Sequence, residues 1–224
     1  MKKITILITF LFFAFNSIGQ ELVFCHTNKI KDDTLINLHY YKVCYSKNNR
    51  GPYYSSFYVT KSRVVKKAER KDNFRPDTSL RKEIRACLNN YKVYGYDRGH
   101  LCNVEAMQFS FNAQDTTFLL ENIALQNKYL NRGVWKSLEN LINKQVIEYD
   151  TIFVVAGVVY DSLSKFDIYS NLMPIPIYFW KVVYIDKFYF CYLFPNKECS
   201  RNYMDYRVDL LEFERVTGFR IENK

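Results

Sequence analysis

Glycine and proline are scarce in this chain, with 7 and 5 among 224 residues. Such a composition excludes collagen-like and low-complexity proteins. No linker rich in proline, glycine or serine and no internal repeat divides the sequence, so we predict a single domain. A Cys-x-x-Cys pair is also missing, which gives little support to a zinc or redox motif.

The apolar run at the amino terminus, 4–15, is twelve residues long. A bilayer requires roughly 20. Lys2 and Lys3 precede the run, and Ser17 and Gly19 follow it, which is the layout of a secretory signal peptide cut after Gly19. We therefore expect residues 1–19 to be a signal peptide and 20–224 one mature domain. That prediction places the protein in the periplasm or outside the cell, with no membrane anchor.

Aromatic residues and positive charge are abundant. The 19 tyrosines and 18 phenylalanines favour the pleated faces of a sheet. A formal charge of +9 favours partners that are polyanions, such as nucleic acid or acidic polysaccharide. The segment 61–71 holds six lysines and arginines against one acid, Glu69. This segment is either a solvated face or, beside a phosphodiester site, a patch that binds the nucleic-acid backbone.

Six cysteines lie beyond the predicted signal peptide. In an exported chain an even count favours disulfides, and six cysteines allow fifteen connectivities. Cys191–Cys199, across a short turn, is the best local pair. Cys25–Cys44 and Cys87–Cys102 would complete the set.

Periodicity predicts strands interrupted by helices. Alternating stretches at 38–46 and 53–60, a buried run at 151–160, and 175–185 with 188–194 as a hairpin predict strands. Helical spacing predicts helices at 131–148 and at 206–218, where Gly218 stops the second. The pattern favours an α+β fold with a mostly antiparallel central sheet flanked by helices.

The stretch "DRGH" at 97–100 carries residue types suited to phosphodiester hydrolysis. Neutral histidine can act as a general base near physiological pH, which suits His100. Gly99 permits a close backbone approach, and Arg98 is a phosphate-binding type. Four residues alone are also explained by a structural histidine near a turn. A thiol hydrolase built on Cys102 is a weaker alternative, because a cysteine of an exported protein is more often in a disulfide.

Two further stretches follow in order: "TFLLENIALQ" at 117–126 and "LNRGVWKSLE" at 130–139. Together with "DRGH" they resemble the DNA/RNA non-specific endonuclease family. The resemblance covers about residues 57–219. It implies a ββα-metal motif set in a larger α+β domain.

The resemblance also implies roles for named residues. His100 is expected to be the general base. Asn131 is expected to bind one divalent cation, Mg²⁺ or alternatively Mn²⁺ or another divalent ion. Glu139 is expected to hold the water shell of that metal. On one regular helix the two residues would differ by about 80° and about 12 Å, which suits one direct and one water-mediated ligand.

Arginines complete the expected site. By resemblance an upstream arginine stabilises the transition state, and Arg70 is the first choice with Arg75 in reserve. Arg98 is expected to bind phosphate. Asp97 is expected to anchor the turn through Arg98 or backbone amides. Asn122 and Gln126 are expected to support the site.

The implied activity is hydrolysis of DNA and RNA to products with 5′-phosphates, by a secreted, metal-dependent enzyme without strong sequence or sugar preference. The alternative is a catalytically silent protein of the same fold that binds nucleic acid or another polyanion. An inhibitor protein or a homodimer stays open as a partner.

Overall fold

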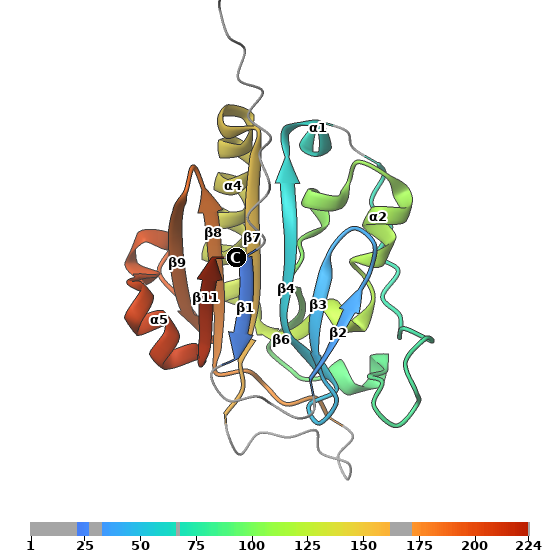
Figure 1. Ribbon diagram of the computed structural model, residues 1–224. Helices are drawn as coiled ribbons and strands as arrows, with labels where there is room; N and C mark the ends of the chain where they lie inside the picture. Colours follow the sequence, from blue (N-terminus) through green and yellow to red (C-terminus); the bar gives the residue numbers. More distant parts are fainter. Residues whose placement is uncertain (1–21, 27–32, 66–67, 162–171, 224) are drawn as a thin grey trace, which may run out of the picture.

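A seven-stranded antiparallel sheet forms the centre of the protein (Figure 1). The computed structural model describes residues 22–26, 33–65, 68–161 and 172–223. The strand order is β10-β9-β8-β7-β4-β3-β2. In chain order the strands are β2 (Asp33–Asn37), β3 (Lys42–Ser46), β4 (Gly51–Thr60), β7 (Thr151–Val159), β8 (Tyr178–Ile185), β9 (Phe188–Pro195) and β10 (Arg207–Val208). The predicted α+β class with a mostly antiparallel sheet is confirmed.

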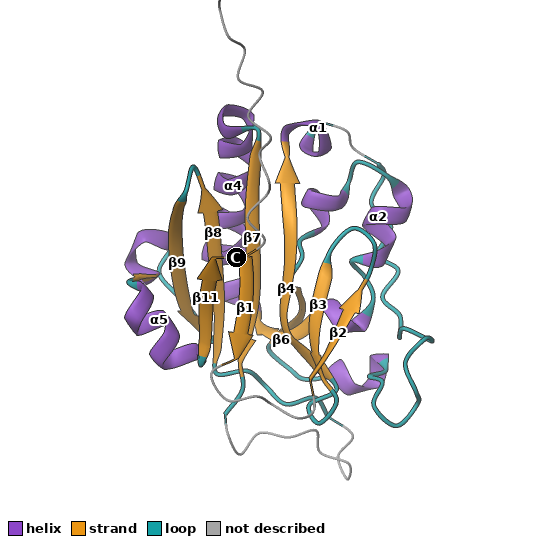
Figure 2. Ribbon diagram, in the orientation of Figure 1, coloured by secondary structure: helices purple, strands orange, loops and turns teal. Residues whose placement is uncertain are grey.

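Both faces of the sheet are covered, which explains why its strands are rich in apolar residues (Figures 1 and 2). Helix α4 (Lys136–Tyr149) buries Leu138, Ile142 and Val146 against one face. The helical spacing of these residues places them on one side of the helix. The opposite face is covered by α5 (Leu210–Thr217) and by β11 (Phe219–Asn223), which pairs with β1 (Leu22–His26).

Strand β8 shows how the sequence divides between the two faces. Phe179 and Val183 belong to the core under α4, whereas Trp180 and Val182 belong to the core under α5. Lys181 lies between Trp180 and Val182, so its side chain points to the α4 side, where it is fully buried despite its charge. A lysine at this place departs from the apolar pattern of its strand.

A hairpin followed by a helix is attached to the central sheet. Strand β5 (Tyr96–His100) pairs antiparallel with β6 (Ile123–Asn127), and the chain then enters α3 (Lys128–Leu130), a π-helical turn η4 (Asn131–Trp135) and α4. The segment between β5 and β6 holds η2 (Val104–Met107), α2 (Phe111–Thr116) and η3 (Leu120–Asn122). Short turns α1 (Lys61–Val64), η1 (Leu88–Tyr91) and η5 (Tyr203–Tyr206) complete the described helices.

The helix predicted at 131–148 is irregular at its start. Gly133 has φ −102° and ψ −115°, so regular α-helix begins only at Lys136. A π turn widens the helix locally, and such turns are frequent at functional sites. The regular-helix offset between Asn131 and Glu139 therefore does not apply. The second predicted helix also starts later, at Leu210, and ends at Gly218 with φ 71°, a left-handed cap that favours glycine.

The predicted disulfides are not supported. Cys87, Cys102, Cys191 and Cys199 are all free thiols. Cys102 is buried in the apolar core, and burial raises the pKa of its thiol well above the ordinary value. The pair Cys25–Cys44 involves a side chain outside the described residues. No helix within the described ranges is long and apolar enough to cross a membrane.

Candidate active site

The largest cleft, about 1050 Å³, lies where the hairpin meets the start of α4. Its walls come from β5, from the chain around residue 72, from η1 and η2, and from the π turn with the first turn of α4. The lining includes Arg70, Asp72, Phe74, Tyr96, Asp97, Arg98, His100, Glu105, Asn131, Arg132, Lys136 and Glu139. The structure therefore brings the predicted base, the predicted metal ligands and two predicted arginines to one cavity.

His100 ends β5, opposite Ile123 of β6, and its ring is packed between two phenylalanines. The imidazole centroid lies 5.2 Å from that of Phe74 and 5.1 Å from that of Phe118. Its Nε2 is buried and has no hydrogen-bond partner. Burial, and then the charge of Arg70, lower the pKa of His100 to about 3. The ring is consequently neutral at pH 7 and can accept a proton.

Asn131 is oriented by Asp97. The Nδ2 of Asn131 donates a hydrogen bond of 3.0 Å to Oδ2 of Asp97. A carboxylate only accepts hydrogen bonds, so the amide nitrogen must face it and Oδ1 must face the other way. Oδ1 is a hard oxygen donor of the kind that Mg²⁺ and Mn²⁺ bind. The orientation of this amide fits a divalent cation in the cleft.

Asp97 is in turn held by Arg132. The guanidinium donates from Nε to Oδ2 at 2.8 Å and from Nη2 to Oδ1 at 2.7 Å. Burial alone would raise the pKa of Asp97, but the hydrogen bonds from Arg132 and Asn131 lower it below its ordinary value. Among the described residues the partners of Asp97 are Arg132 and Asn131, in place of the expected anchors, Arg98 and backbone amides. The sequence did not indicate a role for Arg132. Its ion pair with Asp97 joins the π turn to β5, which lies 35 positions earlier in the chain.

Glu139 lies in the first turn of α4 and is only 6% exposed. Its Oε1 lies 3.5 Å from Nζ of Lys181, and its Oε2 lies 3.9 Å from Nζ of Lys136. Burial raises the pKa of Glu139, and the charge of Lys181 opposes that rise. The carboxylate is thus held between one lysine in the core and one at the cleft.

The sequence motifs also missed Glu105 and Lys136, which line the cleft and form an ion pair. Lys136 donates a hydrogen bond to Oε1 of Glu105 and joins it electrostatically to Glu139. Burial would raise the pKa of Glu105, but Lys136 lowers it. Glu105 is in η2 and Lys136 in α4, 31 positions apart, so no local spacing in the sequence announces the pair.

Two arginines face the cleft, and the third does not. Arg98 stacks its guanidinium 4.1 Å from the ring centroid of Phe74, and Arg70 lies 5.6 Å from that of Phe118. Arg70 is also paired with Asp72 at 2.7 Å. Both guanidiniums lie on the rings that enclose His100.

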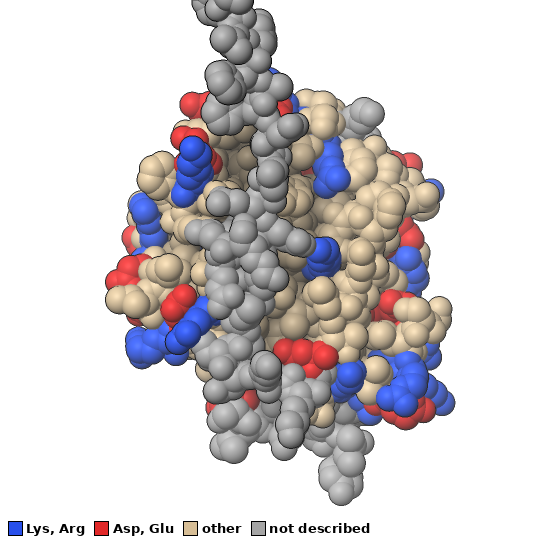
Figure 3. Space-filling model, viewed as in Figure 1, with Lys and Arg blue, Asp and Glu red and all other residues tan. Residues whose placement is uncertain are grey.

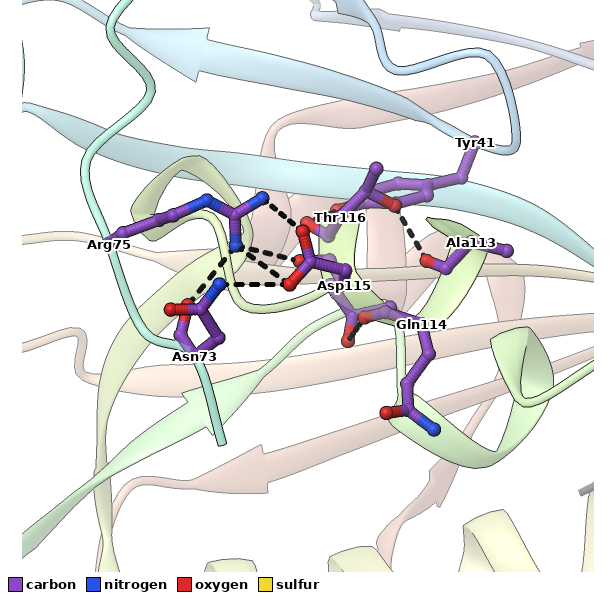
Figure 4. A network of polar contacts seen from close by, with 8 residues as sticks. Tyr41, Asn73, Arg75, Ala113, Gln114, Asp115 and Thr116 are labelled. Atoms are coloured by element: carbon purple, nitrogen blue, oxygen red, sulfur yellow. Dashed lines mark hydrogen bonds and ion pairs between the residues drawn. The ribbon is translucent and has the colours of Figure 1, made fainter. Parts of the chain in front are cut away.

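Arg75 is used in the framework instead (Figure 4). It forms an ion pair of 2.5 Å with Asp115 and also donates to the backbone oxygens of Asn73 and Asp115. It does not line the cleft. With its donors committed to α2, Arg75 has no support as a substrate-binding residue, and Arg70 is the arginine that the geometry favours.

Asn122 ties the segment after His100 to the rest of the protein. Its Oδ1 accepts hydrogen bonds from Ser55 Oγ and from the backbone N of Cys102, both at 2.8 Å. Its Nδ2 donates to the backbone oxygens of Cys102 and Thr117. A buried amide whose hydrogen-bonding groups are satisfied thus holds the chain two residues after His100.

Gln126 packs against the backbone of β5. A Cβ added at Gly99 would lie 2.6 Å from Cβ of Gln126 and closer still to its Oε1. Both side-chain polar atoms of Gln126 are buried without hydrogen-bond partners. Glycine is required at position 99 because the Gln126 side chain occupies that space.

Positive charge is mixed with negative charge on the surface. On the face viewed in Figure 3, lysines and arginines are interspersed with acids. The net charge of the chain therefore forms no single basic stripe among the described residues on that face. Among the described residues no three His, Cys, Asp or Glu side chains cluster so as to hold a metal ion.

Fold and site together define a class. The first strand of an antiparallel hairpin ends in His100, and the helical segment that follows the second strand presents Asn131 and Glu139 to the same cleft; this is a ββα arrangement. The model of the DNA/RNA non-specific endonuclease family matches residues 21–224. The chain belongs to that family, as its motifs predicted.

Named relatives agree with this assignment. The chain is 28% identical over 156 residues to human endonuclease G, mitochondrial, covering 65% of this chain and 52% of the relative. It is 27% identical over 209 residues to the mitochondrial nuclease of Saccharomyces cerevisiae, covering 81% and 63%. A nuclease of Nostoc sp. is 27% identical over 208 residues, covering 86% and 74%. The chain spans about half to two thirds of the length of the first two relatives.

A solved structure supports the fold. The crystal structure of the EndoG/EndoGI complex, which concerns the mechanism of EndoG inhibition, superposes with a TM-score of 0.74 at 24% identity. The match covers 84% of this chain and 85% of the other.

The comparisons contradict the prediction of export. Endonuclease G and the yeast nuclease are mitochondrial proteins by name, as is nuclease 1 of Schizosaccharomyces pombe. The predicted signal peptide, 1–19, lies outside the described residues. A charged start followed by an apolar run was too general a pattern to establish a secretory address.

Proposed function

We propose that this protein is a metal-dependent nuclease that hydrolyses phosphodiester bonds of DNA and RNA and leaves 5′-phosphates. Residues 20–224 would form its single nuclease domain. The observation that carries the proposal is the pairing, in one cleft, of a neutral His100 with an Asn131 amide whose oxygen is freed by Asp97. The names of the relatives, endonuclease G and nucleases, support the same reaction class.

In this mechanism His100 takes a proton from the attacking water. Its low pKa keeps the ring unprotonated before substrate arrives, and the negative phosphate raises its basicity when bound. Asn131 would hold one divalent cation through Oδ1, and Glu139 would accept hydrogen bonds from waters of that ion. The cation, Mg²⁺ or Mn²⁺, supplies Lewis-acid stabilisation of charge developing on the phosphate.

The arginines and the cleft determine what is bound. Arg70 and Arg98 project guanidiniums beside His100, where they can donate to phosphate oxygens and offset charge in the transition state. Contacts to phosphate carry no sequence information, which supports cleavage without strong base preference.

The test is cleavage of plasmid DNA and of RNA by the purified chain, with Mg²⁺ or with EDTA. We expect cleavage that requires the metal and is lost in His100→Ala. His39→Asn is the matched control, because His39 lies outside the cleft with φ 67°, a conformation that asparagine tolerates. Nucleic acid that is shifted in a gel but stays intact, with wild-type protein and metal, would instead identify the silent binding protein.

The product ends are a separate measurement. Cleaved fragments should be ligatable without kinase treatment, because the 5′-phosphate stays on the product. Fragments that ligate only after kinase treatment would contradict the proposed direction of P–O cleavage.

A further inference from the structure

Lys181 is the one buried basic side chain among the residues whose burial is described, with an exposed fraction of 1%. It lies in the middle of β8 between Trp180 and Val182 and has its α-carbon opposite Ala156 and Tyr192. Removing an ammonium group from water is costly, and apolar residues of similar volume generally serve stability as well or better. The packing of the core alone therefore does not explain a lysine at this place.

The contacts of Lys181 lead to the start of α4. Its Nζ lies 3.5 Å from Oε1 of Glu139 and 3.9 Å from the ring centroid of Trp135. Trp135 is itself fixed by edge contacts with Phe179 at 5.6 Å and Phe194 at 5.8 Å. One ammonium group thus contacts two residues of adjacent helical turns, both of which line the cleft.

These contacts give the two oxygens of Glu139 different surroundings. Oε1 is held from the sheet side by Lys181, while Oε2 lies on the side of Lys136, which reaches Glu105 across the cleft wall. The other titratable groups that face this cluster are the buried Cys102 thiol and the Glu105 carboxylate. A carboxylate anchored at one oxygen presents the other in a defined direction.

We propose that Lys181 is a positioning residue of the active site: it holds Glu139 from the core so that the second carboxylate oxygen faces the cation in the cleft. The inference rests on the proposed function, because it assumes that Glu139 acts on the metal's waters. Lys181 itself touches neither metal nor substrate. Through Glu139 of α4, the metal affinity of the cleft then depends on a buried side chain of β8.

The experiment measures Mn²⁺ binding to the purified protein without nucleic acid, from the electron paramagnetic resonance signal of free Mn²⁺. Asn131→Ala identifies the site by loss of binding. In Lys181→Met we expect the dissociation constant for Mn²⁺ to rise about tenfold, the lower end of the effect of outer-sphere partners. Lys144→Met is the matched control, since Lys144 is an exposed lysine of α4, the helix that carries Glu139, and lies outside the cleft.

A double-mutant cycle separates positioning from a general structural effect. In the background of Glu139→Gln, adding Lys181→Met should leave the Mn²⁺ dissociation constant unchanged, because Lys181 acts only through Glu139. The double variant buries no unpaired charge, so it serves even where the single variant Lys181→Met fails to fold. Equal affinity of the double variant and Glu139→Gln supports the inference.

Two results would overturn the inference. One is a folded Lys181→Met that binds Mn²⁺ as the wild type does. The other is an equal loss of affinity in both backgrounds. If the wild type binds no Mn²⁺ and cleaves nothing, the proposed function fails and the inference with it, a pattern distinct from either result.

Discussion

His100, whose imidazole Nε2 is buried, shows how packing can set the protonation state of one residue. Two phenylalanine rings exclude water from Nε2, and two arginines face the same space. Low dielectric and nearby positive charge both disfavour the charged ring. The residue is therefore neutral before substrate arrives, whatever its motif, because of the residues that surround it.

We predict that His100 stays neutral well below the ordinary histidine pKa. Its folded-state pKa, about 3, lies below the unfolded value of about 6.5. The neutral ring thus contributes stability above pH 6.5, and that contribution is lost as the pH falls toward 3. Nuclear magnetic resonance of the imidazole carbons should show no titration between pH 8 and pH 5, with the signal assigned by its absence in His100→Ala. A midpoint near 6.5 would contradict the burial argument.

At the same scale, Asp97 determines which atom of Asn131 faces the cleft. In Asp97→Asn the partner can accept or donate, so the Asn131 amide is no longer held in one orientation. We expect cleavage to fall by about 10- to 100-fold and to require more Mg²⁺. The matched control is Asp186→Asn, at the turn between β8 and β9, where φ is 48° and asparagine is tolerated. Unchanged metal dependence in Asp97→Asn would remove the orientation argument.

At the scale of elements, the hairpin and the helix depend on close approach between β5 and β6. Gly99 and Ala124 are opposite each other, and the Gln126 side chain lies against the β5 backbone. Asn122 then fixes the chain that leaves β5 by bonding both backbone groups of Cys102. Together these contacts hold His100 in register with Ile123 of β6.

We expect Gly99→Ala to destabilise the protein by about 1–3 kcal/mol through overpacking against Gln126. The double variant Gly99→Ala with Gln126→Gly should lose less stability than the sum of the two single variants, because the second change removes the Cβ that the new methyl would meet and two buried polar atoms without partners. Urea unfolding of the two single variants and the double variant measures the coupling. Additive losses would mean that another contact limits position 99.

At the scale of the molecule, the central sheet separates two cores and gives the hairpin a firm base. The core under α4 supports the helix that carries Glu139, and α5 and β11 cover the opposite face of the sheet (Figure 1). The cleft receives side chains from residues 70 to 139, which only the assembled layers bring together. The proposed contacts with a nucleic-acid backbone therefore depend on the whole assembled cleft.

Salt dependence tests which arginines contact phosphate. In a His100→Ala background with EDTA, fluorescence anisotropy with a labelled single-stranded oligonucleotide gives the slope of log affinity against log salt. Arg70→Ala and Arg98→Ala should each reduce that slope by about 0.7. Arg75→Ala should leave the slope unchanged and lower the melting temperature, because Asp115 loses its partner. A reduced slope in Arg75→Ala would return that residue to the binding surface.

Much of the fold could be read from local pattern. Strands β4, β7, β8 and β9 lie within one to three residues of the predicted ends, because alternation and apolar runs report burial directly. The irregular start of the helix at 131 could not be predicted from the sequence. The π turn does not change the spacing of the apolar residues that follow it, such as Leu138 and Ile142. Export was predicted from the layout of the amino terminus and disulfides from the cysteine count, and neither pattern specifies an address or a partner.

The sequence by itself determined the family, the antiparallel framework and the set of chemical groups, because the order of the motifs and the types of side chain are properties of the sequence itself. Only the tertiary structure decided how those groups act. It assigned Arg75 to Asp115, turned the Asn131 amide through Asp97, and brought Lys181 from β8 beneath Glu139. These outcomes depend on distances between residues far apart in the chain, and local spacing carries no record of such distances.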